Sequence, residues 1–401
     1  MTRRVRIMIS LLLAILLAGS TGCGAGGTMN TGNGSDKTGA QIDRQESILH
    51  DEALADQVRR LADTMGFSGS VLVAGPDGIR YAEGFGTADG EGTAANTALT
   101  TYAFGSLSKQ FTAAAVLKLA EEKKLSLSDP VRTFFPAWPE DRVVTVSQLL
   151  HMESGLERDF WNIAYREYGY TLMSQADEFQ LSPHEFDELF SLITTDIAKE
   201  FHFRPGSEYQ YSNINYWLLA EIVGRVSGMS YQDYIRTEFF EPLGLTTAGI
   251  DYPDDIAPGH YGGERTEENA DLYEGCGSIS GNVYDLYAWA LALHGAPGAG
   301  TDAAAAASST ATSETGPRVL GPAAYRVMTA TSAGNYACGL VIDGSVIWHN
   351  GQLNGYNSYM SYNTADGTIL IVLSNSRTYE FRGKQADFPA EELARLLASK
   401  L

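Results

Sequence analysis

The chain has 401 residues, of which 44% are hydrophobic and 19% are charged, a composition typical of a folded globular protein of one large or two small domains. Its formal net charge of −21 at pH 7 argues against nucleic acid as a partner, because an acidic surface repels phosphates. The three cysteines and seven histidines show neither zinc-type spacing nor an H-E-x-x-H pattern, so we expect no metal site.

The N-terminal residues have the pattern of a targeting segment. Three arginines precede an apolar run over residues 7–18, which is too short for a spanning helix and typical of a secretory signal. The run leads into Gly-Ser-Thr-Gly-Cys, which resembles the lipobox of bacterial lipoproteins. We therefore expect a signal peptide over 1–22, lipid attachment at Cys23 and a flexible Gly-, Ser- and Thr-rich tether over 23–45. The protein would be extracytoplasmic, lipid-anchored to a bacterial membrane; plain secretion with cleavage nearby is the alternative.

A folded domain is expected over 46–401, beginning with a helix and a hairpin. Apolar residues recur on one side of a helix over 46–65, at Ile48, Leu49, Leu54, Val58 and Leu61. Two strands, over 68–74 and 79–86, then flank the turn Gly75-Pro76-Asp77-Gly78, which predicts a β-hairpin. The small, polar residues 87–100 form a loop.

An S-x-x-K tetrad, Ser106 to Lys109, follows that loop and opens a helix rich in Ala and Leu. A serine hydroxyl needs a base beside it to act as a nucleophile, and a lysine is a base only when it is neutral. Burial and the positive end of a helix dipole both disfavour the lysine's charge. Alone, the tetrad is more typical of a capping serine before a surface lysine. However, Lys109 is the only lysine with a serine three residues before it, and two further motifs follow.

The middle of the chain is mostly helical. We expect a helix over 144–151, capped by Thr145 or Ser147, helical pieces over 158–200 that shape a cleft, and a low-complexity loop over 295–316. Three further helices are predicted over 213–230, 231–240 and 283–294.

The second motif, Tyr211-Ser212-Asn213, precedes one of these helices and is the only Tyr-x-Asn in the chain. The Tyr211 phenol could shuttle protons if cationic neighbours lower its pKa from about 10. The Asn213 amide offers a donor and acceptors to a substrate amide. A surface turn with a helix-capping asparagine is the alternative.

The C-terminal part alternates like antiparallel strands, over 336–341, 346–349, 358–363 and 369–374, and a helix over 389–401 closes the chain. The third motif, His349-Asn350-Gly351, ends one strand. Gly351 would allow close approach of substrate or backbone. The backbone N–H groups of Gln352 and Ser106 could then form an oxyanion hole. A structural histidine is the alternative reading of His349.

These elements predict an α+β fold in three layers. The two ends of the chain would form one antiparallel sheet flanked by terminal helices, and a helical subdomain over about 105–330 would leave the active site between the two parts. Cys276 and Cys338 could pair as a disulfide or remain two small buried residues.

Taken together, the three motifs resemble those of the serine penicillin-recognising enzymes, nearest to class C β-lactamases, D-alanyl-D-alanine carboxypeptidases and related esterases. The resemblance implies the αβα fold of those enzymes, with Ser106 as acylated nucleophile, Lys109 and Tyr211 as the proton-transfer pair, and Asn213 orienting substrate. His349 replaces the lysine often found in the third motif. The resemblance to this family also includes five short stretches outside the motifs: Asp129-Pro130-Val131, Leu149-Leu150-His151, Ser154-Gly155-Leu156, Arg204-Pro205-Gly206 and Glu241-Pro242-Leu243-Gly244-Leu245.

The expected function is that of a membrane-tethered serine hydrolase, forming an acyl-enzyme on a small-molecule or peptide amide or ester, such as D-amino-acid cell-wall peptides. No metal or organic cofactor is required. Because a histidine is neutral much of the time near pH 7, His349 would bind a substrate carboxylate less well than a lysine. A peptidase or esterase is therefore favoured, with a β-lactamase and a non-turnover penicillin-binding or sensing protein as alternatives. The sequence leaves the oligomeric state open.

Overall fold

The computed structural model describes residues 48–49, 51–89, 92–159, 201–250, 252–253, 255–266, 270–295, 318–381 and 384–401. All of these lie in one compact unit, residues 41–401. The predicted signal peptide, Cys23 and most of the predicted segments 158–200 and 295–316 lie outside them. None of the helices in this part of the chain is long and apolar enough to cross a bilayer.

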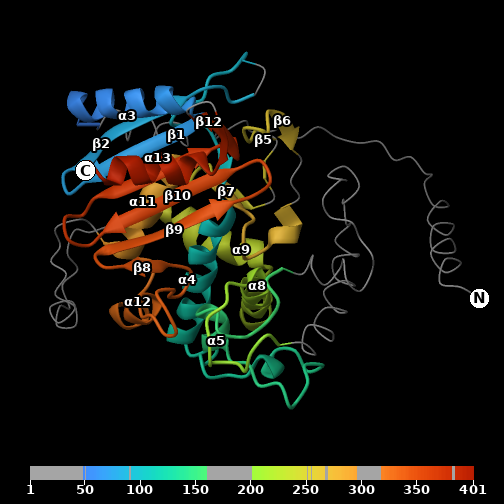
Figure 1. Cartoon of the computed structure of the whole chain (residues 1–401). Coiled ribbons are helices and arrows are strands. Elements are labelled where there is room, and N and C mark those ends of the chain that lie inside the picture. The colour runs from blue at the N-terminus through green and yellow to red at the C-terminus, as the bar shows by residue number, and fades with distance from the viewer. Residues whose placement is uncertain are drawn as a thin grey trace, which may run out of the picture. The chain divides into compact units, whose positions relative to one another are not determined.

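A six-stranded antiparallel sheet forms the centre of the fold, with strand order β2-β1-β11-β10-β9-β8 (Figure 1). Strand β1 pairs with β11, so the two ends of the chain meet in one sheet, as predicted. The strands of this sheet are β1 (Gly69–Gly75), β2 (Gly78–Phe85), β8 (Val341–Asp343), β9 (Val346–Gln352), β10 (Asn357–Asn363) and β11 (Ile369–Ser374). Short sheets are formed by β3 (Tyr102–Ala103), β4 (Gly249–Ile250) and β7 (Ile279–Gly281), by β5 (Gly259–Tyr261) and β6 (Glu264–Thr266), and by β12 (Thr378–Phe381) and β13 (Lys384–Asp387).

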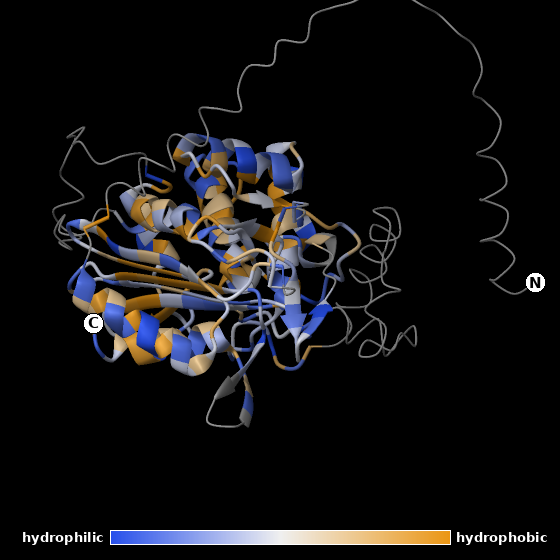
Figure 2. Ribbon diagram, turned by 90° about the horizontal axis from the view of Figure 1, so that it is seen from above, coloured by the Kyte–Doolittle hydropathy of each residue, from blue (hydrophilic) through white to orange (hydrophobic). Residues whose placement is uncertain are grey.

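Helices cover both faces of the large sheet. Their bounds are α3 (Glu52–Met65), α4 (Ser108–Glu121), α5 (Val146–Leu150), α8 (Asn213–Ser227), α9 (Tyr231–Ile235), α10 (Glu241–Leu243), α11 (Val283–His294), α12 (Pro322–Met328) and α13 (Pro389–Ala398). The terminal helices α3 and α13 lie on one face, and their apolar residues form a core with it. Figure 2 shows the mostly hydrophobic strands of the sheet between helices of mixed hydropathy. Helix α11 packs on the opposite face, together with the mostly helical part that contains α4, α5, α8 and α9 (Figure 1).

The alternation of side chains along β1 divides the core in two, because successive residues of a strand point to opposite faces. Val71 and Val73 join the core beneath α3 and α13, whereas Leu72 and Ala74 join the core shared with the helical part. All seven residues of β1 are buried, since both faces of the strand are covered. The result is the predicted three-layer α+β arrangement.

Local sequence signals predicted most elements correctly. The hairpin, α11 and β11 occur where predicted, and Thr145 caps α5 with a capping box. The helix predicted over 231–240 begins as α9 and continues as a π-helical segment, Arg236–Phe240.

Several element bounds were wrong. Helix α8 ends at Ser227 and not at residue 230, and β9 continues to Gln352, beyond the strand predicted over 346–349. The first helix begins at Glu52 and not at residue 46, because the Asp51 carboxylate accepts the backbone N–H of Leu54 and caps it there. Leu49, predicted to lie on its apolar side, is 54% exposed. The strand predicted over 336–341 is also wrong: Tyr336 makes only an isolated bridge, and β8 begins at Val341. In addition, the hairpin β12–β13 and helix α12 were not predicted.

Candidate active site

Ser106 lies in a short 3-10 helix, η1 (Gly105–Leu107), that leads directly into α4. Gly105 has a φ of 56°, in the left-handed region that glycine adopts without strain. A Cβ at this position would also lie 2.9 Å from the backbone nitrogen of Gln352 on β9. Gly105 therefore permits both the turn that presents Ser106 and the close approach of β9 to it.

Lys109 lies one turn further, in the first turn of α4, and its side chain is fully buried. Its Nζ is 3.0 Å from Ser106 Oγ, 2.7 Å from Asn213 Oδ1 and 2.8 Å from the backbone oxygen of Cys276. Burial lowers the pKa of Lys109 to about 8, against opposing contributions from Cys276 and Asp159. Roughly a tenth of the lysine is therefore neutral at pH 7 and half of it at pH 8. The prediction that burial disfavours the charged form of Lys109 is confirmed by the direction of this pKa shift.

Tyr211 and Asn213 lie beside Lys109, at the start of α8, of which Asn213 is the first residue. The ring centroid of Tyr211 is 5.0 Å from Lys109 Nζ, and its hydroxyl is hydrogen-bonded to Ser106. Burial raises the pKa of Tyr211, an effect that its bond to Ser106 and the charge of Arg158 only partly offset. The cation of Arg158 does lower this pKa, but desolvation dominates, so the condition of a lowered pKa, under which the phenol could shuttle protons, is not met. The phenol therefore keeps its proton near neutral pH.

Met152 holds the segment that carries Tyr211. Its backbone oxygen accepts the N–H of Gln210 at 2.9 Å, and its Sδ accepts the N–H of Ser212 at 3.3 Å. These two bonds fix the backbone on both sides of Tyr211. Met152 itself has a φ of 60°, which is uncommon for a residue with a side chain. A backbone held in this region is typical of a position with a specific structural demand.

His349 projects from β9 into the core shared with the helical part and is 2% exposed. Its Nδ1 lies 2.6 Å from the backbone oxygen of Asn350, so Nδ1 carries the proton, and Nε2 accepts the hydroxyl of Tyr336 at 3.2 Å. Burial, with a smaller contribution from Lys109, lowers the pKa of His349 to about 3. The expectation of a neutral histidine is confirmed.

The backbone N–H of Gln352 faces away from β10. Leu353 donates its N–H to Tyr356 across the hairpin, and pairs of residues in an antiparallel ladder alternate between bonded and non-bonded. The next pair, Gln352 with Asn357, is therefore non-bonded, and its N–H groups point outward. The Gln352 side chain is held by Glu391 on α13, at 2.9 Å. The N–H thus lies on the edge of β9 that approaches Gly105.

Gly351, next to it, allows this approach. A Cβ on Gly351 would lie 2.0 Å from the backbone oxygen of Phe104 and 2.2 Å from Ser358 Oγ. The group that approaches Gly351 closely is therefore the backbone of Phe104. The fold brings the predicted site residues to one place between the sheet and the helical part: Ser106, Lys109, Tyr211, Asn213, His349, Gly351 and Gln352.

Sequence reasoning missed several groups around this place. The backbone oxygen of Cys276 is an acceptor for Lys109, although it is 167 residues away and no motif marks it. Arg158 and Asp159 lie beside Tyr211 and Asn213. They follow the family phrase Ser154-Gly155-Leu156 after one intervening residue, and that phrase is the one signal that pointed to this stretch. Cys276 and Cys338 are both buried and unpaired, which confirms the reading of two small buried residues.

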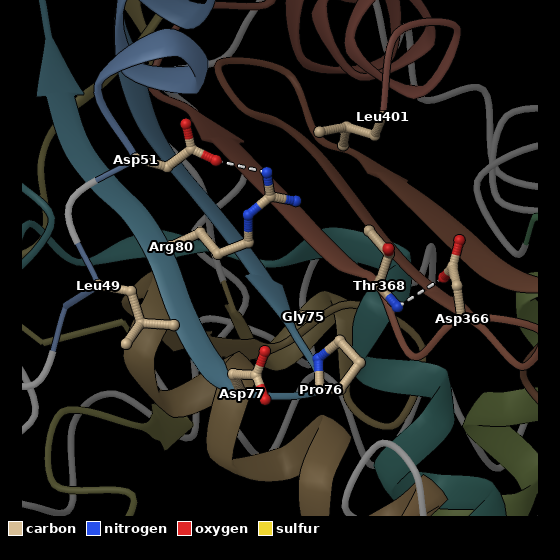
Figure 3. A pocket seen from close by; sticks show the side chains of 9 residues that line it. All are labelled: Leu49, Asp51, Gly75, Pro76, Asp77, Arg80, Asp366, Thr368 and Leu401. Atoms are coloured by element: carbon tan, nitrogen blue, oxygen red, sulfur yellow. Dashed lines mark hydrogen bonds and ion pairs between the residues drawn. The ribbon is translucent and has the colours of Figure 1, made fainter.

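A surface pocket elsewhere does not contain any of the predicted site residues (Figure 3). It is lined by Asp51, Arg80 and residues of the turns at 75–77 and 366–368, and the Asp51 carboxylate pairs with Arg80. The strand register puts it at the opposite end of the sheet from Gly69, which aligns with Gln352 across β11 and β10. Seven residues of β1 separate the two ends, roughly 20 Å.

Comparisons with known proteins agree with this geometry. The protein-family model described as beta-lactamase matches residues 55–394. The putative penicillin-binding protein PbpX of Bacillus subtilis (strain 168) is 27% identical over 322 residues, which cover 78% of this chain and 71% of that protein.

Solved structures share the fold. The octameric penicillin-binding protein homologue from Pyrococcus abyssi superposes with a TM-score of 0.66 at 24% identity, over 87% of this chain and 77% of that one. The D-amino acid amidase from Ochrobactrum anthropi SV3 superposes with a TM-score of 0.63 at 20% identity, over 86% of this chain and 96% of that one. The family match covers most of the chain, including all three motifs and the strands that bring them together. The chain belongs to the beta-lactamase family of serine hydrolases.

Proposed function

We propose that this protein hydrolyses amides or esters through an acyl-enzyme on Ser106, with Lys109 as the base that activates it. The observation that carries the proposal is the pair itself. Lys109 Nζ lies 3.0 Å from Ser106 Oγ, and burial lowers the lysine's pKa to about 8, so a neutral amine is available near neutral pH.

The proposed acylation moves one proton and exchanges one bond. Lys109 Nζ takes the proton of Ser106 Oγ while the oxygen bonds to the substrate carbonyl carbon. The resulting oxyanion is stabilised by the N–H groups of Ser106 and Gln352. Tyr211, which keeps its proton, donates it to the leaving nitrogen or oxygen as the old bond breaks, and regains a proton from Lys109. Water then releases the acyl group by the reverse sequence.

Among the residues that the structure describes, the charges around the site favour substrates without an essential carboxylate. His349 is neutral and buried, and it faces Asn350 and Tyr336 with both ring nitrogens. The Arg158 guanidinium lies over Tyr211, but the Asp159 carboxylate is 3.3 Å from its Nε. Esters and amides, including those of D-amino acids, therefore suit the site better than penicillins, whose binding needs a cation for the carboxylate. The similarity to a D-amino acid amidase supports the D-amino-acid class.

A penicillin-binding protein without turnover is the second candidate function, and a β-lactamase is the third. The relative from Bacillus subtilis is named as a putative penicillin-binding protein, which makes acylation by penicillin a direct probe. The acyl group would be released slowly if the site activates Ser106 well for acylation but activates water poorly for the hydrolysis that follows.

Intact-mass spectrometry of the full-length protein tests these proposals. The protein is incubated separately with a fluorophosphonate, a penicillin and a p-nitrophenyl ester, and ester release is followed in parallel. We expect a single fluorophosphonate adduct and ester turnover, both abolished in Ser106→Ala and both retained in Ser128→Ala, which changes an exposed serine. A stable penicillin adduct without ester turnover would favour the penicillin-binding alternative. Equal labelling of Ser106→Ala would rule out Ser106 as the nucleophile.

We also propose that a lipid on Cys23 tethers the protein to the bacterial membrane, as the lipobox-like stretch before it suggests. Expressed in a bacterium, the protein should fractionate with membranes and incorporate labelled fatty acid. Cys23→Ala should release it to the soluble fraction without the label. Membrane association that survives this change would contradict the lipid anchor.

A further inference from the structure

The orientation of the Asn213 amide decides whether Lys109 can act as a base. A neutral amine has two N–H donors and one lone pair, whereas an ammonium has three donors and no lone pair. Lys109 Nζ has three neighbours within hydrogen-bond distance: Ser106 Oγ, Asn213 Oδ1 and the oxygen of Cys276. If the two oxygens of Asn213 and Cys276 take the two N–H groups, the lone pair is left for the hydroxyl proton of Ser106.

A rotated amide would reverse this arrangement. The two ends of an asparagine amide have nearly the same shape but opposite hydrogen-bonding character. With Nδ2 facing Lys109, the amide would offer a donor where the lysine needs an acceptor. The neutral amine would then turn its lone pair towards Asn213, away from Ser106. Nothing in the shape of the Asn213 side chain prevents this rotation. The orientation must therefore be fixed by the group that contacts the other end of the amide.

At that far end, Asn213 Nδ2 donates to Asp159 Oδ1 at 2.6 Å. An ionised carboxylate only accepts hydrogen bonds, so it pairs with the NH2 end of the amide and repels the oxygen end. The other oxygen of Asp159, Oδ2, lies 3.3 Å from Arg158 Nε, and the Asp159 side chain is only 27% exposed. Furthermore, the backbone N–H of Asn213 donates to the oxygen of Arg158 at 2.7 Å, which holds the two segments together.

We propose that Asp159 is a positioning residue for catalysis: by accepting the Asn213 amide, it keeps Asn213 Oδ1 on Lys109 and so directs the lysine's lone pair to Ser106. This inference rests on the proposed function, in which Lys109 is the base. Asp159 does not touch the reacting atoms and acts through Asn213. Its negative charge has a second, separable effect, because it favours the charged form of Lys109 and raises that pKa.

The two effects give Asp159→Asn a distinctive signature. An asparagine at 159 has the same size but both donates and accepts, so it satisfies either orientation of Asn213 and removes the bias. We expect the plateau of kcat/KM for an ester to fall by about 10- to 100-fold, the size of one lost hydrogen bond to a charged group. At the same time the acidic limb of the pH profile should move to lower pH, because one contribution that raises the pKa of Lys109 is gone.

Two further variants separate positioning from structure and from general charge. Asp159→Glu keeps an acceptor-only carboxylate and should retain more activity than Asp159→Asn. Glu157→Gln changes a carboxylate two residues earlier, which contacts His202 and the backbone N–H of Arg158, and should leave rate and pH profile close to wild type. Thermal unfolding of each variant is measured beside the rates, with fluorophosphonate labelling of Ser106 as a second readout.

The outcomes are distinct. An active wild type, with a slower Asp159→Asn whose acidic limb lies at lower pH, supports the positioning role. Wild-type kinetics in Asp159→Asn, or equal losses in Asp159→Asn and Asp159→Glu, would overturn it. A loss of rate with an unchanged limb and a lowered melting temperature would reduce Asp159 to a structural residue. A wild type in which Ser106 is never labelled overturns the proposed function first, and the inference with it.

Discussion

Gly351→Ala tests whether the contact between β9 and the nucleophile segment is needed for catalysis. The added Cβ would lie 2.0 Å from the backbone oxygen of Phe104 and 2.2 Å from Ser358 Oγ. Ser358 Oγ itself donates to that Phe104 oxygen at 2.7 Å, so the two obstructing groups are bonded to each other and cannot move independently. Since real Cβ atoms do not approach below 3.0 Å, β9 and the Phe104 segment must separate by at least about 1 Å.

This separation has a cost in both stability and rate. Overpacking of this kind lowers the free energy of unfolding by about 1–3 kcal/mol. It also moves the N–H of Gln352, the neighbour of Gly351, away from Ser106. A misplacement of about 1 Å in a catalytic group reduces the rate by about 100-fold. We therefore expect the variant to fold, with lower stability, and to lose about two orders of magnitude in ester turnover.

The assay combines urea unfolding with ester kinetics and Ser106 labelling. Gly344→Ala is the matched control: Gly344 lies at the turn between β8 and β9 with a φ of 58°, and nothing lies within 4 Å of its added Cβ. It should cost about 1–2 kcal/mol through backbone strain alone and leave turnover intact. A Gly351→Ala variant as active as this control would refute the argument that the β9 edge takes part in catalysis.

Three further predictions follow from the buried groups. In ester assays at a series of pH values, the acidic limb of kcat/KM should have its midpoint near pH 8, the pKa of Lys109. Arg158→Gln should move this midpoint to higher pH, because Arg158 lowers that pKa. A midpoint that stays the same in Arg158→Gln would contradict Lys109 as the base. Unfolded Lys109 keeps its proton up to about pH 10.4, so between about pH 8 and about pH 10 the unfolded state binds more protons and the free energy of unfolding should rise by about 1.4 kcal/mol per pH unit from this group. Urea unfolding at two pH values should show this rise in wild type and lose it in Lys109→Met. Finally, iodoacetamide should leave Cys276 and Cys338 unmodified in the folded protein, since both are buried and burial raises the pKa of the Cys276 thiol to about 11; peptide mapping that finds either alkylated without denaturant would contradict the packing.

Local chemistry determined what the sequence could predict. The hairpin β1–β2, the capped helix α5 and helix α11 depend on turn residues, capping side chains and apolar spacing among neighbours along the chain. The same holds for the spacing of Ser106 and Lys109, which one helical turn brings together. The order of the three motifs indicated the family, and with it the arrangement of the sheet. In each case the deciding contacts lie within a few residues, or within a pattern that the family repeats.

Only the tertiary structure decided the protonation and orientation of the site. The pKa of Lys109 depends on complete burial and on Cys276 and Asp159, which are distant in the chain. The pKa of Tyr211 is raised and not lowered, because desolvation outweighs the nearby cation, and a sequence does not show how deeply a phenol is covered. Likewise, Met152 makes two hydrogen bonds to the segment that carries Tyr211, and Asp159 makes one to Asn213, all between separate chain segments. Burial and hydrogen-bond geometry are properties of the packed chain, which is why local patterns pointed to the candidate catalytic groups but not to their charge states.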